Sequence, residues 1–350
     1  MNMMFVEDCC EILDSMRIPI TAADRKEGEY PYYGANGIQD YVAGYIFDDE
    51  LVLLAEDGGN FGSKEKPIAY RVSGKCWVNN HAHVLKPKAG LDVDYLCYSL
   101  MFYKVDGMVN GATRQKLTQS AMRKMQIPSR CMEEQKHIVD ELNRIIKIKE
   151  QRQQELQLLD ELIKARFVEM FGDPATNPMR WSETTIGDEC FYIKDGPHKS
   201  LPDIGKENGG HPFISVRNIV NGYIDFSTAR YISDEDYANA IKKCHPEKGD
   251  MLYSKGGTTG IAKLIDIDEE FANWVHVAVL KFDKSKLNGI FFENMLNGDY
   301  CFEQSQRLTK GIANRDLVLS AMAQIKMYRP PMEIQKQFAD FVKQVNKSKF

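Results

Sequence analysis

The feature that most constrains the fold is a phrase that the chain contains twice. Residues 111–122 read GATRQKLTQSAM, and residues 311–322 read GIANRDLVLSAM. At a fixed offset of 200, ten of the 32 positions that begin at Gly111 are identical. A weaker similarity links EYPYYGANGI (29–38) with GHPFISVRNI (210–219). A period near half the chain length is too long for a solenoid. It predicts two whole domains of one kind, joined in series.

Length and composition agree with two domains. At 350 residues, two domains of about 130 to 160 residues are the default expectation. Apolar residues make up 43% of the chain, enough for two hydrophobic cores. No run of 18 apolar residues exists and the N-terminus does not read as a signal peptide, so we expect no membrane span and a cytoplasmic location.

The cysteines and histidines are too scattered to predict a disulfide framework or a metal site. Eight cysteines occur without any Cys-x-x-Cys spacing, which favours reduced thiols in a cytosolic protein. The pairs His81-x-His83 and Cys244-His245 are isolated, whereas structural zinc needs four ligands in compact pairs. We therefore expect no metal.

A heptad pattern from Ile138 to Met170 predicts one long helix between the domains. Gly172 and Pro174 mark its end. About 38 residues make a rod of roughly 55–60 Å, longer than a simple linker needs. The residues expected to pair with another helix are Ile138, Leu142, Ile145, Leu156, Leu159 and Ile163.

A second helix with a similar start follows the second domain. It begins near "PPMEIQKQFADFVKQV" and reaches only Phe350, about half the length of the first. Two such helices are expected to pack as an antiparallel coiled coil with a pseudo-twofold axis. Strand-like runs such as GDMLYSK and NWVHVAVLKF alternate with helical stretches, so the fold class is mixed α/β. The predicted segments are 1–130, 131–172, 173–330 and 331–350.

Charge is informative only where it is read locally. The 45 basic and 50 acidic residues give a net charge of −5, which does not favour non-specific binding to nucleic acid. Three stretches lack acids but contain several Lys or Arg, namely 66–91, 107–132 and 304–315. Basic loops rich in Gly, Asn, Gln and Thr can neutralise phosphates and contact base edges. Solvated surface is the alternative, but matching places in both copies favour DNA contact.

Catalytic motifs are missing. GGTTGIAK (256–263) lacks the Lys-Ser/Thr ending of a phosphate-binding loop, and no Gly-x-Ser-x-Gly elbow occurs. YRPPM (328–332) lacks the first residue and the aromatic of the adenine-methyltransferase signature Asn/Asp-Pro-Pro-Tyr/Phe. The sequence predicts no active site.

The whole chain resembles a type I restriction-modification specificity (S) subunit. The motifs that carry the resemblance are PYYGANGI, LLAEDGG, GDMLYSKGGTTGIAKLI, IPSRCMEEQKHIVDEL and LIKARFVEMFGDP. The resemblance implies two target-recognition domains (1–130 and 173–330) joined by a central conserved helix (131–172), with 331–350 as a short second conserved helix. Relatives usually carry a second helix about as long as the first, whereas the second helix here stops at Phe350. This difference leaves the stoichiometry of the partner subunits open.

The resemblance implies a protein without chemistry of its own. It implies binding of a split double-stranded DNA sequence and of two methyltransferase subunits, which use S-adenosylmethionine. A restriction subunit that uses ATP and Mg is a further implied partner, and this chain itself is expected to bind no cofactor. Because the central helix separates the two target-recognition domains, its length is expected to set the gap between the two half-sites.

Candidate DNA-contacting residues lie in polar or basic loops, preferably in both copies. The predicted set is Asn60, Asn79, Asn80, His81, Thr113, Arg114, Gln115, Lys199, Arg217, Lys255, Thr258, Thr259, Lys310, Asn314 and Arg315. Each of them has a structural alternative: Asn79 and Asn80 can cap a turn, and Arg217 can pair with an acid inside its domain. Two rival classes also stay open: an enzyme hidden in the α/β domains, and a stand-alone sequence-specific DNA-binding protein without a methyltransferase partner.

Overall fold

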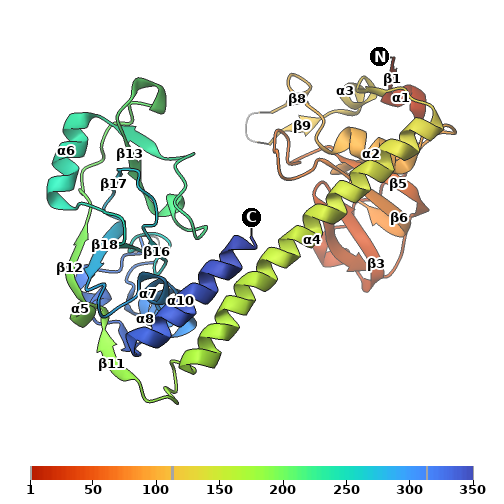
Figure 1. The fold of residues 1–350 in the computed structure, drawn as a ribbon. Helices are drawn as coiled ribbons and strands as arrows, with labels where there is room; N and C mark the ends of the chain where they lie inside the picture. Colours follow the sequence, from red (N-terminus) through yellow and green to blue (C-terminus); the bar gives the residue numbers. More distant parts are fainter. Residues whose placement is uncertain (1, 112–113, 313, 350) are drawn as a thin grey trace. The chain divides into compact units, whose positions relative to one another are not determined.

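The chain folds into two compact units. The computed structural model describes residues 2–111, 114–312 and 314–349. Contacts divide the chain into Met1–Gln151 and Arg152–Phe350. Each unit combines sheets with helices in a similar order, so the predicted mixed α/β class with two similar domains is confirmed (Figure 1). The four predicted segment boundaries stay a prediction.

The first unit is built on a six-stranded sheet with strand order β2-β7-β5-β6-β3-β4. Its neighbours are antiparallel except β3 and β6, which are parallel. Leu51, Val52, Leu53 and Leu54 are all fully buried, because both faces of the central strand are covered. The strands are β2 (Cys10–Ile12), β3 (Glu27–Gly34), β4 (Gly37–Val42), β5 (Phe47–Ala55), β6 (Ala69–Val78) and β7 (Ala82–Pro87).

The second unit divides the same elements between two sheets. The order β12-β18-β15-β16 forms one sheet and β14-β13-β17 the other, with β13 and β17 parallel. The strands are β12 (Cys190–Asp195), β13 (His211–Ile214), β14 (Arg230–Ile232), β15 (Met251–Ser254), β16 (Ala262–Leu264), β17 (Ala272–Asn273) and β18 (Val277–Phe282).

Short helices cover these sheets and connect their strands. The first unit has α1 (Val6–Cys9), α2 (Val93–Met101) and α3 (Gln119–Arg123), with 3-10 turns η1 (Asp14–Met16) and η2 (Ala22–Asp24). The second unit has α5 (Ile186–Glu189), α6 (Asp234–Lys243), α7 (Gly289–Asn297), α8 (Asp299–Leu308) and α9 (Leu319–Met322), with η3 (Lys206–Asn208) and η4 (Val216–Asn218).

A small antiparallel ladder joins the beginning and end of each unit. In the first unit β1 (Met3–Phe5) pairs with β10 (Gln126–Pro128), and in the second β11 (Ser182–Thr185) pairs with β19 (Lys326–Arg329). The first unit adds the pair β8 (Val109–Asn110) and β9 (Lys116–Leu117). The duplication read from the sequence therefore includes the strands that open and close each unit, while the second unit adds α6 and α8.

One buried glutamine fixes each long helix to its own unit. The helices are α4 (Met132–Phe171) and α10 (Met332–Lys347). The Gln135 side chain accepts a hydrogen bond from Asp92 N (2.8 Å) and donates to Gly90 O and Arg130 O (both 2.9 Å). Gln335 makes the equivalent three bonds in the second unit. The repeated Met-Glu-x-Gln motif is thus a structural staple.

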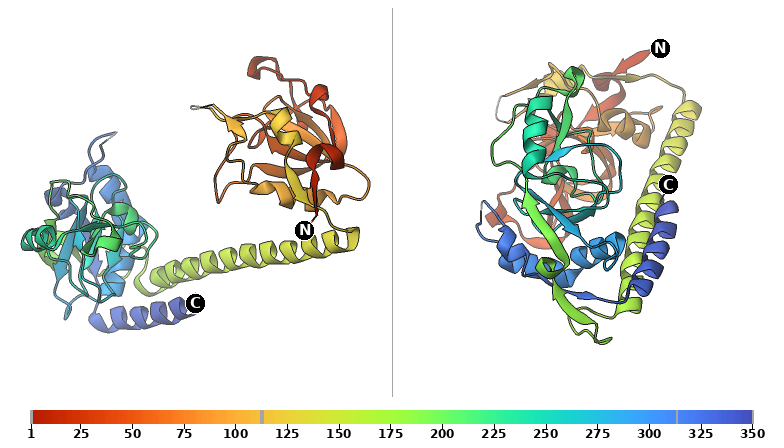
Figure 2. Two further views of the ribbon diagram at one scale, coloured as in Figure 1. Left: turned by 90° about the horizontal axis from the view of Figure 1, so that it is seen from above. Right: turned by 60° about the vertical axis from the view of Figure 1, so that its left-hand side comes forward.

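Within the second unit, α10 runs antiparallel to the C-terminal part of α4 (Figures 1 and 2). The Phe338 ring near the start of α10 contacts Phe167 and Phe171 near the end of α4, with ring centroids 5.4 Å apart in both cases. At the other end of α10, Lys349 Nζ lies 2.5 Å from Asp160 Oδ1. The predicted antiparallel pairing holds over this stretch of the two helices.

The predicted helix-pairing residues separate into two groups. Leu159 and Ile163 pack into the core that includes α10, and Leu156 is half-buried. Ile138, in contrast, packs against the core of the first unit, Leu142 is half-buried, and Ile145 is 60% exposed. The segment after α10 reaches Arg152, whose NH2 donates to Ser348 O at 3.4 Å, and the pairing of Ile138, Leu142 and Ile145 with another helix stays a prediction.

Two further expectations can be compared with the structure. All eight cysteines are free, and seven of them are buried, as expected for reduced thiols. Across 2–111, 114–312 and 314–349, no helix is long and apolar enough to cross a membrane.

Candidate nucleic-acid interface

The repeated phrase forms a loop that is fixed to the end of a central strand. We use the name repeated loop for residues 114–117 of the first unit and 314–317 of the second. In the first unit Leu117 N donates to Glu56 O (2.7 Å), and Gly58 N donates to Gln115 O (3.0 Å). Glu56 N in turn donates to His81 O (2.9 Å). Three chain segments thus meet where β5 ends, and we call this set of backbone hydrogen bonds the frame.

The second unit repeats this backbone frame bond for bond. Leu317 N donates to Lys255 O (2.7 Å), and Gly257 N donates to Arg315 O (3.0 Å). Lys255 N donates to His276 O (2.8 Å). The frame assigns structural equivalents without any sequence alignment. These are Glu56 with Lys255, Asp57 with Gly256, Gly58 with Gly257, His81 with His276, Gln115 with Arg315, and Leu117 with Leu317.

The parallel strand pair extends the frame by one more segment. Asn79 N donates to Tyr33 O (3.0 Å) in the first unit, and Trp274 N donates to Ile214 O (2.9 Å) in the second. Asn79 and Trp274 are therefore equivalent positions. By the same register Asn36 corresponds to Arg217.

In the first unit the frame presents a polar cluster. Arg114 Nε lies 2.6 Å from Asp57 Oδ1, while Asp57 Oδ2 lies 3.3 Å from His81 Nδ1. The side chain of Arg114 is 59% exposed, and Asn36 Nδ2 donates to Gly58 O at 3.0 Å. Arg114 NH2 also lies 3.4 Å from His81 Nδ1, and the N–H groups beyond these two contacts can bind an external acceptor.

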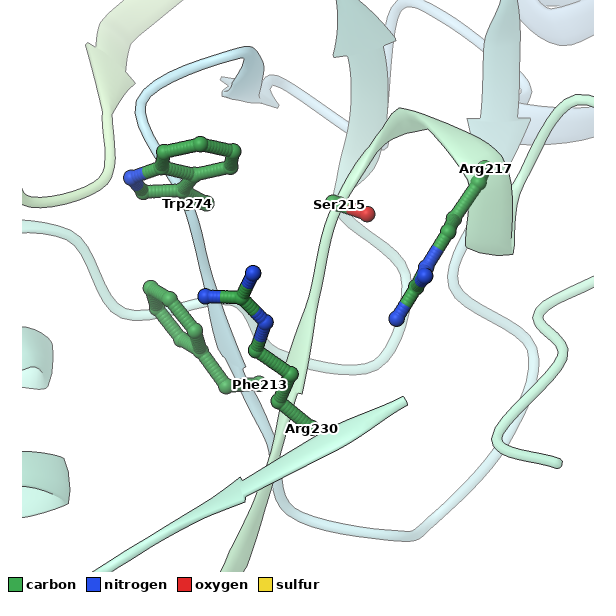
Figure 3. Close-up of a pocket in the computed structure, with 5 residues that line it drawn as sticks. All are labelled: Phe213, Ser215, Arg217, Arg230 and Trp274. Atoms are coloured by element: carbon green, nitrogen blue, oxygen red, sulfur yellow. The ribbon is translucent and has the colours of Figure 1, made fainter. Parts of the chain in front are cut away.

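In the second unit the frame surrounds a hollow instead. A cavity of about 170 Å³ is lined by Phe213, Ser215, Arg217, Arg230 and Trp274 (Figure 3). Figure 3 shows the guanidinium groups of Arg217 and Arg230 on either side of the segment that carries Ser215, with the Trp274 and Phe213 rings on the Arg230 side.

A second hollow of about 390 Å³ shares part of this wall. It is also lined by His276, Asn314 and Arg315. The rings of Trp274 and His276 meet edge to face, with centroids 4.7 Å apart. Trp274 Nε1 and His276 Nδ1 are buried without a hydrogen-bond partner among the described residues. Aromatic faces beside guanidinium groups are the surface that bases and phosphates bind.

Comparison with known proteins identifies the family. The sequence profile of the type I restriction modification DNA specificity domain matches residues 1–158 and again residues 178–350. The chain belongs to the type I restriction-modification DNA specificity family. The two matches coincide with the two copies of the frame, so the duplication and the family assignment agree.

Relatives of this specificity chain are similar over most of its length. A Haemophilus influenzae protein named as a type I restriction enzyme specificity subunit is 30% identical over 275 residues, which is 76% of this chain and 68% of the relative. The MjaVIII specificity subunit of Methanocaldococcus jannaschii is 21% identical over 97% of this chain and 85% of its own. The type I S subunit structure from M. genitalium has a TM-score of 0.60 at 14% identity, with 99% and 90% of the two chains covered. This last similarity concerns the fold.

Two predicted DNA contacts of the specificity chain are buried. Lys255 is 5% exposed, and its Nζ lies 2.8 Å from Asp316 Oδ1 and 3.6 Å from Asp195 Oδ2. Thr259 is 2% exposed and shares a hydrogen bond with the Thr309 hydroxyl at 3.0 Å. Both side chains fix the repeated loop from behind. We therefore remove them from the set of direct DNA contacts.

Asn79 also has a structural role. Its side chain is 3% exposed, accepts a hydrogen bond from His81 N (2.8 Å) and donates to Gln39 Oε1 (3.0 Å). The alternative given for this residue, a turn cap, fits these contacts. Asn79 thus holds His81 in position and does not face solvent itself.

The remaining predicted residues lie at various distances from the frame. Asn60 is half-buried and donates to Pro67 O at 3.4 Å. Four others are exposed on the surface, namely Asn80, Lys199, Thr258 and Lys310. Thr113 lies outside the described residues. The frame brings together Asn79, His81, Arg114 and Gln115 in the first unit, and Arg217, Asn314 and Arg315 in the second.

Several residues at the frame escaped the sequence prediction, namely Asn36, Asp57, Arg230, Trp274 and His276. A signal for one pair was present, because the weaker repeat aligns Asn36 with Arg217. Trp274 carries no such signal, since its equivalence with Asn79 follows only from the strand register.

A buried charge network supports the repeated loop of the first unit. His83 is fully buried, with Nδ1 2.7 Å from Asp14 Oδ2 and Nε2 2.9 Å from Leu117 O. These two contacts fix the orientation of the buried ring. Arg17 NH1 lies 2.6 Å from Glu56 Oε2.

The same network could be mistaken for a metal site. Asp14, Glu56 and His83 bring their ligand atoms within 4.8 Å of one another. Burial acts to raise the pKa of Asp14, but hydrogen bonds, above all from His83, leave the pKa below its ordinary value. Cationic and N–H groups thus already occupy these carboxylates, and the donor set fits an ion-pair network better than a cation site.

Proposed function

We propose that this chain is the DNA-recognition subunit of a type I restriction-modification enzyme, and that each unit reads one half of a bipartite DNA sequence. The observation that carries the proposal is the backbone frame, which occurs once in each unit and presents different side chains in each. A duplicated frame suits a target that is read twice, while different side chains suit two different half-sequences.

The chemistry of the loops supports this role. Arg114 and Arg315 lie one position apart in the aligned repeated loops, and Arg is the side chain that binds a guanine edge in bidentate fashion. The chain as a whole carries a net charge of −5, so attraction for phosphates depends on such local basic sites. We expect binding to be specific and short-ranged, with little affinity for DNA of arbitrary sequence.

We further propose that the chain acts in the cytoplasm, contributes no catalytic group and holds methyltransferase subunits, which supply S-adenosylmethionine chemistry. A restriction subunit would bring ATP and Mg. The relatives named as specificity subunits support such partners. A solved structure described as the basis of complex assembly and conformational transition of the type I system supports them too. Its TM-score is 0.54 at 13% identity, and the similarity covers 99% of this chain and 90% of that chain. In this arrangement the length of α4 would set the gap between the half-sites.

The test compares Arg114→Ala with Arg315→Ala in the chain co-purified with its methyltransferase subunits. Methylation is measured on DNA in which one half-site or the other is varied. Each substitution is expected to relax its own half by about 5- to 150-fold, which corresponds to about 1–3 kcal/mol for an Arg–guanine contact. Lys248→Ala, at an exposed ion pair of the second unit, is the control.

Two outcomes would contradict the proposal. Loss of both halves from either substitution, with partner binding intact, would exclude separate readers. Methylation by the chain without its partners would show that the catalytic groups lie here.

A further inference from the structure

The two copies of the frame differ where it opens to solvent. On the buried side of the repeated loop the two units agree, because Leu117 and Leu317 are fully buried at equivalent positions. At the opening, Asn36 in the first unit stands where Arg217 stands in the second. A shared scaffold with a changed side chain is the pattern expected of a position that selects between ligands.

Both residues at this position lie near equivalent glycines. Asn36 Nδ2 donates to Gly58 O at 3.0 Å, and Arg217 lines the hollow together with Gly257. Gly58 and Gly257 are equivalent, because each donates its N–H to the repeated loop. The position therefore lies beside the repeated loop in both units, where a base contacted by that loop would also be within reach.

The neighbourhood of Arg217 is suited to a base edge. One terminal nitrogen of Arg217 donates to Thr228 O at 2.6 Å, which leaves its other N–H groups free to bind an acceptor pair. Arg217 is exposed, and the Trp274 ring forms part of the wall of the same hollow. A second guanidinium, that of Arg230, lines the same hollow.

The aromatic wall exists because of a residue change behind it. A Cβ at Gly256 would lie 1.9 Å from His276 Nδ1, so the His276 ring can occupy its place only beside glycine. The first unit has Asp57 at this position, and there Nδ1 of the His81 ring lies 3.3 Å from the carboxylate instead. The exchange of Asp57 against Gly256 thus makes room for the His276 ring, and the exchange of Asn79 against Trp274 adds the second ring of the wall.

On the basis of the proposed function, we infer that positions 36 and 217 are equivalent specificity-determining positions. Arg217 contacts a guanine edge in the half-site of the second unit, and Asn36 contacts an adenine edge in the half-site of the first. The assignment follows from side-chain geometry: the Arg fork matches guanine O6 and N7, and the Asn amide matches adenine N6 and N7.

The experiment uses the full chain with its co-purified methyltransferase subunits and a pool of random-sequence double-stranded DNA. Sequencing of the bound fraction gives the preferred bases at each position. The variants are Arg217→Asn, which installs the residue of the other unit, and Arg217→Lys, which keeps the charge but removes the fork. Asn36→Arg is the reciprocal change.

We expect Arg217→Asn to shift one position of one half from guanine towards adenine, with a loss of preference for guanine of about 5- to 150-fold. Arg217→Lys is expected to lose the same preference while the salt dependence of binding stays unchanged. Asn36→Arg should alter a single position of the other half. The unaltered half of each variant reports that the protein is folded and assembled.

Failure of the inference is distinguishable from failure of the proposed function. If the wild-type complex selects no bipartite sequence, the proposed function fails. If it does, but Arg217→Asn and Arg217→Lys leave every base preference unchanged, position 217 does not determine specificity. A uniform loss across all sequences, with a salt slope shallower by about one, would make Arg217 a phosphate contact and overturn the inference.

Discussion

Lys255 and Asp316 form an ion pair at 2.8 Å at the two positions where the first unit has Glu56 and Lys116, which pair at 3.0 Å with the charges exchanged. In both units the pair joins the end of a central strand to the repeated loop. Both copies therefore keep an ion pair between the same two positions, although the acidic and basic residues are exchanged. Such residues stabilise the loop that carries Arg114 in the first unit and Arg315 in the second.

Removal of the buried partner should be costly. Lys255→Met leaves Asp195 and Asp316 without this cation, although Lys243 still pairs with Asp195 at 2.8 Å. We expect a loss of about 2–3 kcal/mol in the free energy of unfolding, somewhat below the usual value for a broken buried pair. Lys116→Met is the matched control, because that side chain is 51% exposed and should cost less than about 1 kcal/mol. Equal shifts in urea denaturation would contradict this ranking.

The glycine that opens the repeated phrase cannot carry a side chain. Gly111 has φ +101°, and a Cβ there would lie 2.4 Å from the carbonyl oxygen of Arg114. Gly111→Ala should therefore distort the loop and weaken recognition of the first half-site by at least about tenfold. Gly107→Ala is the control: φ is +74° but no atom lies within 4 Å, so only about 1–2 kcal/mol of backbone strain is expected. The measurement is methylation of half-site variants, and an unaffected first half in Gly111→Ala would refute the argument.

The glutamine staple of the second helix should be as important as a core residue. Gln335 is fully buried, accepts from Asn288 N at 2.8 Å and donates to Lys286 O (3.2 Å) and Pro330 O (2.7 Å). Gln335→Ala leaves these backbone groups unpaired, so we expect a loss of about 3 kcal/mol. Gln153→Ala, at an exposed position of α4, should change stability by less than about 0.5 kcal/mol. Thermal and urea unfolding compare the two, and a small effect at Gln335 would count against the staple.

Acid should destabilise the first unit through Asp14. Burial opposes ionisation of this carboxyl, but hydrogen bonds from His83, Val84 N and Gln119 hold its pKa below the ordinary 3.8. A lowered pKa contributes stability that is complete above about pH 4 and is lost as the pH falls through the folded-state pKa. Urea denaturation between pH 5 and pH 2 should therefore show a shallower pH dependence for Asp14→Asn than for the wild type. The exposed Asp106→Asn is the control and should leave the slope unchanged.

Local pattern was sufficient for the long helix but not for what it contacts. The apolar spacing between Ile138 and Met170 predicted the long helix α4, and Gly172 and Pro174 marked the end that the structure places at Phe171. The same spacing predicted that Ile138 and Ile163 both pair with another helix. In the structure each packs in the core of a different unit, and Ile145 is exposed. Periodicity records that a helix face is apolar, whereas the partner of that face depends on residues far away in the sequence.

The sequence by itself determined the duplication, the mixed α/β class, the long helix and the family, because each of these depends on order along the chain. The tertiary structure decided which polar residues are available to DNA. Lys255 and Arg217 look alike as basic residues in glycine-rich surroundings, but one is buried in ion pairs and the other lines a hollow. The equivalence of Asn79 and Trp274 follows only from the register of a parallel strand pair. Burial and register result from contacts between distant segments, so they are fixed only when the chain has folded.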